Sequence, residues 1–412
     1  MYYLIGFLIE IVFLGIIEKR HWGTWITPLN VLSVPYALSV ITIILYRKFV
    51  PDIPEFYYPS LIIWMFGLLL FEFPSIVKSR SISSLPKRKY INILITDSDD
   101  SYKLLRNIAY FSIIISLIKI RNLSGALSSF GSDSFSAQYQ SSSIYNHLSV
   151  LVSCIFSYAI YKYDSNHKTS IIIIVGSLIG MFAIGTKSWI IAPFLIGYYA
   201  RLLTGKLKLS FKTTIFPILI IFIIFFTSYY ISLVFLVEGE LSNEILSFIG
   251  NHFVDYFCSG ALTLGIDYKM GFVEPDMTSA LFAPPLNIFN ALFGFDYIYT
   301  INPIFIDIGV LGTSNVRTFF GTIAAYSKSI IVFVIITSIL SYFIYSIYAK
   351  ACKSNSIFLL LANSANLTFL TFGFFDFYWL TLSSYEIPAL FLIMHYFLYI
   401  KQIRRNKERL IS

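Results

Sequence analysis

The segment TTIFPILIIFIIFFTSYYISLVFLV, residues 213–237, decides the fold class. A helix needs about 20 apolar residues to cross the roughly 30 Å of hydrocarbon in a bilayer, and this segment contains no charged side chain. Across the chain, 57% of residues are hydrophobic and 13% are charged, whereas a soluble domain carries about 25% charge. These proportions exclude a water-soluble globular protein and predict an all-α, polytopic integral membrane protein.

Other long apolar runs lie on both sides of this segment. They predict about eleven transmembrane helices and one large region that does not cross the membrane. The predicted spans are 2–17, 26–46, 57–74, 106–120, 144–161, 169–186, 188–203, 213–237, 326–349, 356–375 and 385–400. The first run has no basic n-region and no small-residue cleavage site, so we expect a retained helix. Residues 1–412 are therefore expected to form a single transmembrane domain.

The basic residues indicate how the chain is oriented. With the C-terminus placed inside, 22 of the 30 Lys and Arg residues fall in inside loops and 8 fall outside. Cytoplasmic loops carry the excess of basic residues in membrane proteins. The sequence therefore predicts a periplasmic N-terminus and a cytoplasmic C-terminus. In such a protein the net charge of +8 reports orientation and predicts no nucleic-acid partner.

Residues 238–325 form the large region that does not cross the membrane. Its composition is not that of a disordered segment, because NHFVDYFCSGALTLGI and NIFNALFGFDYIYT are rich in aromatic and aliphatic residues. Loops longer than about 12–15 residues are usually functional or disordered. We therefore expect an ordered, functional loop of short amphipathic or re-entrant helices on the outer membrane face.

Lys187 lies at the tip of a predicted hairpin within the apolar block 169–203. These 35 residues reach about 53 Å as helix, slightly less than two crossings of about 30 Å each. The tip is therefore expected at or just below the outer boundary, where a cation favours a lipid phosphate. The alternative is a snorkelling lysine that only caps a helix turn.

Arg317, in TSNVRTFFGTIAAY at residues 313–326, is the only arginine of the outer region. Its planar guanidinium suits bidentate phosphate binding. Asn315 and Thr318 could add donors at the start of the following helix, whose N-terminus attracts anions. The alternative is an interfacial ion pair, for instance with Asp307 or Asp296.

Candidate proton acceptors lie in the same outer region. His252 and Asp255 are three positions apart, so they share a helix face, and an imidazole can accept the proton of a sugar hydroxyl. Glu274 and Asp276 flank a proline in a predicted turn and could take that role. The alternatives are a surface histidine and ordinary loop acids. No HExxH, CxxC, GxSxG or Walker pattern occurs, so we predict no metal site and no cofactor.

Several other ionisable residues lie in or near the spans: Glu10, Glu72, Asp376, Glu386 and His395. Charges within membranes are candidates for function. Most of these are near span ends, which favours an interfacial position. Asp376 lies at the outer end of its span, where it could face the same cavity as the outer region.

This layout resembles the bacterial O-antigen polymerase family, the oligosaccharide repeat-unit polymerases. Members often have a Gly-Ser/Thr-Arg tip, which here is Gly185-Thr186-Lys187, with lysine in place of arginine. They also often have an Asn-x-x-Thr-Phe stretch, which is matched by Asn315, Thr318 and Phe319. The resemblance covers most of the chain as a layout, and its motifs are short.

The resemblance implies an inner-membrane glycosyltransferase that joins undecaprenyl-diphosphate-linked oligosaccharides on the periplasmic side, in O-antigen or capsule synthesis. It implies that Lys187 and Arg317, with Asn315 and Thr318, bind the substrate. It implies that His252, or else Glu274 or Asp276, is the catalytic base. Membrane lipids and a polysaccharide chain-length regulator are the further partners that it implies.

Two other functions fit the layout. A lipid-linked oligosaccharide flippase has similar length and hydropathy, although such transporters usually have twelve or more spans in two similar halves. An O-antigen ligase shares the chemistry of the polymerase, and layout barely separates the two.

Overall fold

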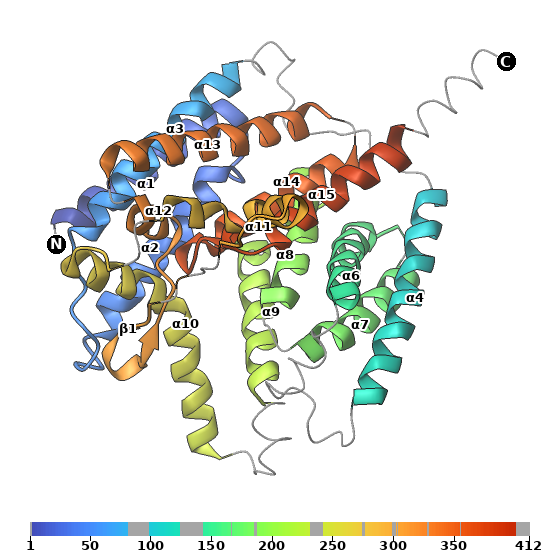
Figure 1. The fold of residues 1–412 in the computed structure, drawn as a ribbon, viewed down its shortest axis with the longest axis horizontal. Coiled ribbons are helices and arrows are strands. Elements are labelled where there is room, and N and C mark those ends of the chain that lie inside the picture. Colours follow the sequence, from blue (N-terminus) through green and yellow to red (C-terminus); the bar gives the residue numbers. More distant parts are fainter. Residues whose placement is uncertain are drawn as a thin grey trace. The chain divides into compact units, whose positions relative to one another are not determined.

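The computed structural model describes residues 2–80, 99–123, 143–165, 167–184, 188–230, 242–273, 277–298, 302, 304–327, 329–354 and 356–400. These residues are almost entirely helical (Figure 1). The strands among them are β1, Ile306–Asp307, and β2, Thr313–Ser314, which pair antiparallel. The predicted all-α class is confirmed.

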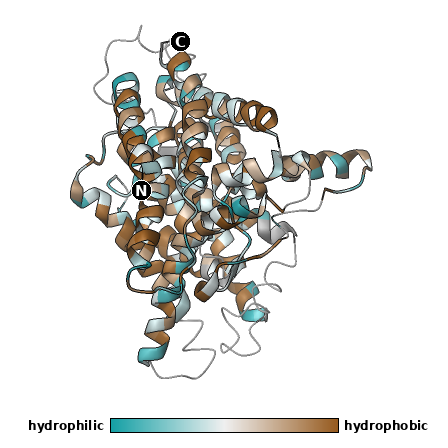
Figure 2. Cartoon of the chain, turned by 90° about the vertical axis from the view of Figure 1, so that its left-hand side faces the viewer, coloured by the Kyte–Doolittle hydropathy of each residue, from teal (hydrophilic) through white to brown (hydrophobic). Residues whose placement is uncertain are grey.

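Five of the described helices are long and apolar enough to cross a membrane. They are Pro28–Tyr46, Ser60–Ser79, Phe211–Tyr230, Ile330–Lys353 and Ile357–Phe374. Figure 2 shows hydrophobic residues along much of the described helices. The chain thus has the character of a multi-pass membrane protein, whereas a total of eleven crossings stays a prediction.

Each predicted span nevertheless overlaps a helix in its described residues, while residues 185–186 and 231–237 of two spans lie outside them. Those helices are α1 (Tyr2–Trp22), α2 (Pro28–Tyr46), α3 (Ser60–Arg80), α4 (Asp99–Leu123), α6 (Ser143–Lys162), α7 (His167–Ile184), α8 (Ser188–Leu203), α9 (Phe211–Tyr230), α13 (Ile330–Lys353), α14 (Ile357–Thr371) and α15 (Ser383–Met394), which a π-helical turn extends to Ile400. Long apolar runs locate helices well because each run must hydrogen-bond its own backbone when it leaves water.

Helices also occupy much of region 238–325, which we expected to be ordered. They are α10 (Asn243–Met270), a 3₁₀ turn at Thr278–Phe282, α11 (Ala283–Phe293), a 3₁₀ turn at Gly309–Leu311 and α12 (Phe319–Ser327). α12 and α13 are separate helices, so the predicted span 326–349 begins later, at Ile330. The position of this region on the outer face stays a prediction.

The chain contacts divide into two compact units. The first comprises residues 1–90, 251–353 and 366–385. Within it, α3 packs against α1 and α13, which lie alongside it in Figure 1, and α12 packs against α3 and α13. Aromatic rings fill this interior: Tyr36 stacks on Trp64 with ring centroids 3.6 Å apart, and Phe320 meets Trp64 edge-on at 4.9 Å.

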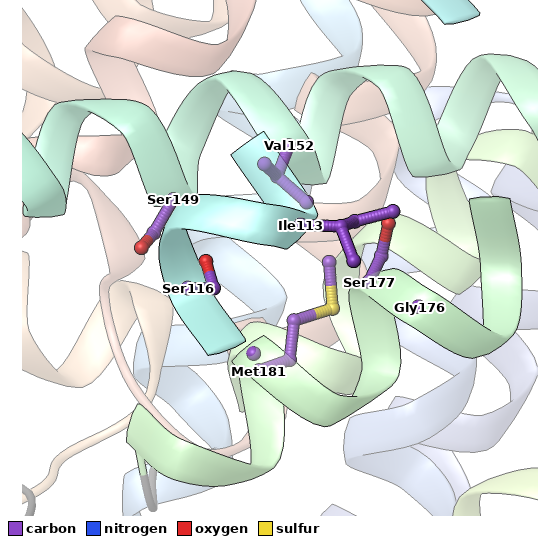
Figure 3. A pocket seen from close by; sticks show the side chains of 8 residues that line it. Ile113, Ser116, Ser149, Val152, Gly176, Ser177 and Met181 are labelled. Carbon is purple, nitrogen blue, oxygen red and sulfur yellow. The ribbon is translucent and has the colours of Figure 1, made fainter. Parts of the chain in front are cut away.

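The second unit comprises residues 91–250, 354–365 and 386–412. Within it, α6 packs against α7 and α8, and α4 packs against α7. Figure 3 shows a small cavity among α4, α6 and α7, lined by Ser116, Ser149, Ser177 and Met181 among others. Its volume is about 10 Å³, which is room for about one water molecule. This cavity is therefore a packing defect and too small for a substrate.

One close approach in the first unit gives a test of its packing. A Cβ added at Gly260 of α10 would lie 2.7 Å from the backbone oxygen of Phe374, which cannot yield easily. We expect Gly260→Ala to lower the stability of the purified protein by about 1–3 kcal/mol, because overpacking displaces backbone. Thermal unfolding in detergent measures the change.

Gly250, on the same helix, is the matched control, since an added Cβ meets nothing within 4 Å there. Gly250→Ala should leave the midpoint unchanged or raise it, because alanine favours helix by about 1 kcal/mol over glycine. Equal midpoints for the two variants would contradict the packing described.

Candidate functional site

Thr318, which immediately precedes α12, has a strained backbone conformation. Its φ of 69° is unusual for a β-branched residue, and such conformations cost about 1–3 kcal/mol. Four hydrogen bonds hold it. Thr318 N donates to Phe375 O at 3.1 Å, and Thr318 O accepts from Thr322 N at 3.0 Å. Thr318 Oγ1 accepts from Trp64 Nε1 at 3.2 Å and from Gly321 N at 3.3 Å.

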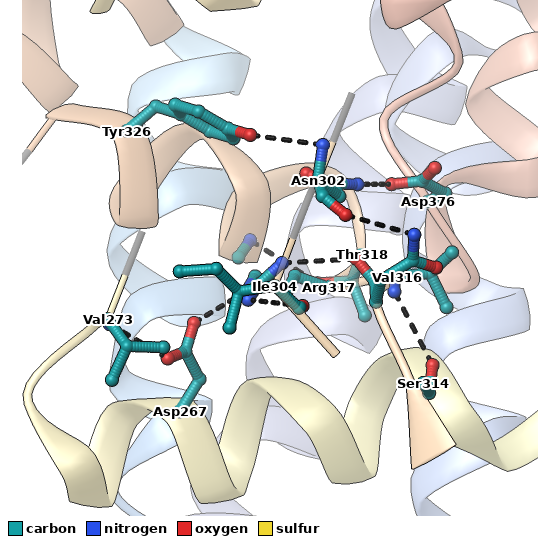
Figure 4. A network of polar contacts seen from close by, with 12 residues as sticks. Asp267, Val273, Asn302, Ile304, Ser314, Val316, Arg317, Thr318, Tyr326 and Asp376 are labelled. Carbon is teal, nitrogen blue, oxygen red and sulfur yellow. Dashed lines mark hydrogen bonds and ion pairs between the residues drawn. The ribbon is translucent and has the colours of Figure 1, made fainter. Parts of the chain in front are cut away.

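Arg317, the preceding residue, is fully buried and forms an ion pair with Asp267 of α10 (Figure 4). Its Nε lies 2.6 Å from Asp267 Oδ2, and Asp267 is fully buried as well. Arg317 Nη1 donates to Asn315 O at 3.0 Å, and Nη2 donates to Ile304 O at 3.3 Å. The guanidinium therefore joins α10 to the chain just before β1, at Ile304, and just after β2, at Asn315.

The second carboxylate oxygen of Asp267 is also used. Asp267 Oδ1 accepts from Val273 N at 3.1 Å, just beyond the end of α10. A buried ion pair compensates for its lost hydration only when further hydrogen bonds satisfy both partners. Both partners here have such bonds, so the pair is a fixed element of the structure.

Asn302 connects this ion pair to a second carboxylate, that of Asp376. Asn302 is 1% exposed and has a φ of 41°. Its Nδ2 donates to Asp376 Oδ1 at 3.2 Å, its N donates to the hydroxyl of Tyr326 at 3.1 Å, and its O accepts from Asn315 Nδ2 at 2.9 Å. Asn302 Oδ1 is buried and receives no hydrogen bond from the described residues.

Burial raises the pKa of Asp376 to about 6. The Phe377 N–H, the Asn302 amide, the positive charge of Arg317 and the Thr322 hydroxyl act in the opposite direction and limit this shift. The side chain is only partly buried. Asp376 can therefore accept or release a proton near neutral pH, which is the property of a general acid or base.

The structure brings together three of the residues predicted from sequence, namely Asn315, Arg317 and Thr318. The ion pair considered as an alternative for Arg317 exists, with Asp267 as the acidic partner where we had considered Asp307 or Asp296. Lys187, Glu274 and Asp276 lie outside the described residues.

His252 lies elsewhere on α10. It precedes Asp267 by 15 residues on one continuous helix, which corresponds to about 22 Å along the axis. Its ring meets that of Tyr256 with centroids 6.0 Å apart. Asp255 shares this end of the helix, and burial raises its pKa to about 6. The predicted pair of His252 and Asp255 is therefore distant from Asp267 along α10. Tyr256, the residue after Asp255, nevertheless stacks on Phe375, beside Asp376, with ring centroids 5.6 Å apart.

Sequence reasoning missed Asp267, Asn302 and Tyr326. One signal for Asp267 was available, because it is a single acid within the apolar run CSGALTLGIDY, and a buried charge requires a partner. Asn302 and Tyr326 had no such signal, since their roles depend on contacts with residues distant in sequence.

The same unit also has a hollow lined by cations. Arg47 and Lys48, at the end of α2, line a pocket of about 170 Å³ together with Ile43, Ile44, Phe56 and Tyr58. Basic groups beside aromatic rings suit an anionic headgroup or a phosphate.

The buried ion pair predicts a large effect of Arg317→Met. Removal of the guanidinium leaves the buried Asp267 carboxylate unpaired, which should lower the free energy of unfolding by about 3–5 kcal/mol. Arg201→Met is the control, because its partner Asp164, 2.9 Å away, has a side chain that is 53% exposed and stays hydrated without the arginine, so the loss should be smaller. Thermal unfolding in detergent gives both values, and similar losses in the two variants would contradict the assignment.

Asp376 predicts a dependence of stability on pH. The pKa of the Asp376 carboxyl is about 6 in the folded protein and 3.8 in the unfolded chain. Between these pH values the folded protein holds a proton on Asp376 that the unfolded chain has released. The free energy of unfolding therefore falls as pH rises from 3.8 to about 6. Asp376→Asn should remove this fall and gain up to about 3 kcal/mol relative to the parent at pH 7. Unfolding at a series of pH values checks this, and Asp164→Asn should show no such gain.

Comparisons with known proteins bear on the family. A search of curated proteins and a search of solved structures each found no match. A family model with the description "Family of unknown function (DUF6337)" matches residues 52–405, which include α3 to α15. They also include the polar group around Arg317, which consists of Asp267, Asn302, Asn315, Arg317, Thr318, Tyr326 and Asp376. Because this match covers most of the chain, the protein belongs to the DUF6337 family.

Proposed function

We propose that this protein is a membrane glycosyltransferase that polymerises oligosaccharide repeat units carried on a polyprenyl diphosphate. The observation that carries the proposal is the polar group in the first unit, where Asp376 is bonded to Asn302 within the field of the buried Arg317. The apolar helices around it are consistent with a lipid-linked substrate. The resemblance to the O-antigen polymerases supports the same reaction.

The reaction requires one proton acceptor. A hydroxyl oxygen of the acceptor sugar attacks the anomeric carbon of the donor, and the bond from that carbon to the diphosphate oxygen breaks. The hydroxyl proton passes to the Asp376 carboxylate, and the polyprenyl diphosphate leaves with its negative charge. A base with a pKa of about 6 is largely deprotonated at neutral pH, so Asp376 is ready for this step.

Arg317 is assigned a positioning role in this proposal. Its guanidinium already bonds to Asp267 and to two backbone carbonyls, so it holds Asn315 and Ile304. The diphosphate then requires other cations. We assign it to Arg47 and Lys48, which line the pocket at the end of α2.

One observation favours a second candidate, a lipid-linked oligosaccharide flippase. Two buried carboxylates, those of Glu18 and Glu72, lie in apolar helices of the first unit. Such groups occur in proton-coupled transporters. If the protein were a transporter, the polar group around Asp376 would have no chemical role. We therefore rank the flippase below the polymerase.

Deletion of the gene in its native strain tests the proposal directly. We expect the ladder of surface polysaccharide on a gel to collapse to a core that carries one repeat unit, because flipping and ligation still operate. Loss of that single-repeat band would contradict the polymerase and favour the flippase or a ligase. Accumulation of lipid-linked polymer would then identify the ligase.

Complementation with variants tests the assigned base. Asp376→Asn should reduce polymer formation by about 10²–10⁴-fold, the contribution of a general base, at equal protein level in the membrane. His252→Ala is the comparison variant and should keep the ladder, because the proposal gives the proton of the acceptor hydroxyl to Asp376. A full ladder with Asp376→Asn and none with His252→Ala would return the base role to His252.

A further inference from the structure

Two carboxylates are in contact inside the helices of the first unit, away from the Asp376 group. Glu18 of α1 is 0% exposed and Glu72 of α3 is 3% exposed. The two helices pack against each other, and Glu72 lies within a helix long and apolar enough to cross a membrane. A buried carboxylate in such surroundings must be paired, hydrogen-bonded or neutral.

The hydrogen bonds made to Glu18 satisfy only one of the four carboxylate oxygens of the pair. Glu18 Oε1 accepts from the Ser75 hydroxyl and from Tyr345 Oη, the latter at 2.8 Å. Trp22 Nε1 donates to Ser75 Oγ at 2.9 Å, so this hydroxyl directs its own proton to Glu18. Glu18 Oε2 and both oxygens of Glu72 are buried and receive no hydrogen bond from the described residues.

The two carboxyl groups are close enough to hydrogen-bond to each other when one of them carries a proton. Two like charges in contact in a medium of low dielectric cannot both be ionised. The titratable groups that face the pair are His21 of α1 and Tyr345 and Tyr348 of α13. His21 Nδ1 lies 4.0 Å from Glu72 Oε1, and its side chain is 33% exposed.

The site favours a proton over a metal ion. Among the described residues, no group of three or more His, Cys, Asp or Glu side chains could hold a metal. The hydroxyls of Ser75 and Tyr345 donate hydrogen bonds to Glu18, so their hydrogen atoms point towards the pair. A metal ion would instead require oxygen lone pairs directed at it. A single proton held between Glu18 Oε2 and one oxygen of Glu72 links the two carboxyl groups and leaves only the other Glu72 oxygen without a hydrogen bond from the described residues.

We propose that Glu18 and Glu72 bind one exchangeable proton between them, and that the partly exposed His21 passes this proton between water and the pair. On uptake, the imidazolium of His21 releases its proton to a Glu72 oxygen and becomes neutral. On release, both carboxyl groups would be ionised, which their contact does not allow, so α1 has to move away from α3. Proton occupancy therefore sets the packing of these helices, whichever reaction the Asp376 group performs.

Labelling with dicyclohexylcarbodiimide tests the site, because this apolar reagent modifies protonated carboxyl groups in membranes. The full-length protein in lipid nanodiscs is treated at pH values from about 5 to about 9. We expect the pair to take one adduct, on either Glu18 or Glu72 and never on both in one chain, by peptide mass spectrometry, with a yield that falls as pH rises. Glu72→Gln should lower the labelling of Glu18 at least tenfold, because the amide offers a donor that lets Glu18 ionise.

Glu10→Gln is the matched control, because Glu10 is another carboxyl of α1 whose oxygens are buried and receive no hydrogen bond within the described part of the chain. This variant should keep the adduct on the pair. If Glu72→Gln fails to fold by size-exclusion chromatography, His21→Asn replaces it and should slow labelling by severalfold. Absence of any adduct on the pair, labelling of Glu18 unchanged in both variants, or protection by Na⁺ at constant pH would overturn the proposal.

Discussion

The buried contact between Arg317 and Asp267 is the constraint on which the first unit depends. A guanidinium and a carboxylate removed from water require donors and acceptors on every side, and the chain supplies them from distant segments. Asp267 fixes the end of α10 through Val273, while Arg317 fixes Ile304 and Asn315. Because Asn315 in turn holds Asn302, the position of Asp376 follows from a charge pair that it does not touch directly.

The helices were predictable because their cause is local. A run such as 213–237 must form helix wherever water is scarce, so α9 appears where apolar residues accumulate. The site was predictable only in part. Asn315, Arg317 and Thr318 are neighbours in sequence, so a motif that identifies one of them identifies the other two as well. Asp267 is separated from Arg317 by 50 residues and Asn302 from Asp376 by 74, and no local pattern records such pairings.

Two kinds of carboxylate share this unit and show what surroundings do to one functional group. Asp376 is partly exposed, receives N–H donors and lies in the field of a cation. Glu18 and Glu72 have each other, two hydroxyls and one imidazole. The first arrangement suits a proton exchanged with a substrate hydroxyl, and the second suits a proton held within the helices. The fold thus separates a carboxyl group that is partly exposed, Asp376, from two carboxyl groups in the apolar interior, Glu18 and Glu72.

The bonds of Thr318 and Asn302 have a consequence for the synthesis of the chain. Both residues adopt left-handed backbone conformations that are held by partners made later, Phe375 and Asp376. At about 5–20 residues per second, the ribosome needs about 3–11 seconds to progress from Thr318 to Phe375. During this interval the segment cannot keep its final geometry, although α10 and Asp267 already exist. The polar group is therefore completed at the end of translation, and a chain truncated before residue 375 would insert helices into a membrane without assembling it.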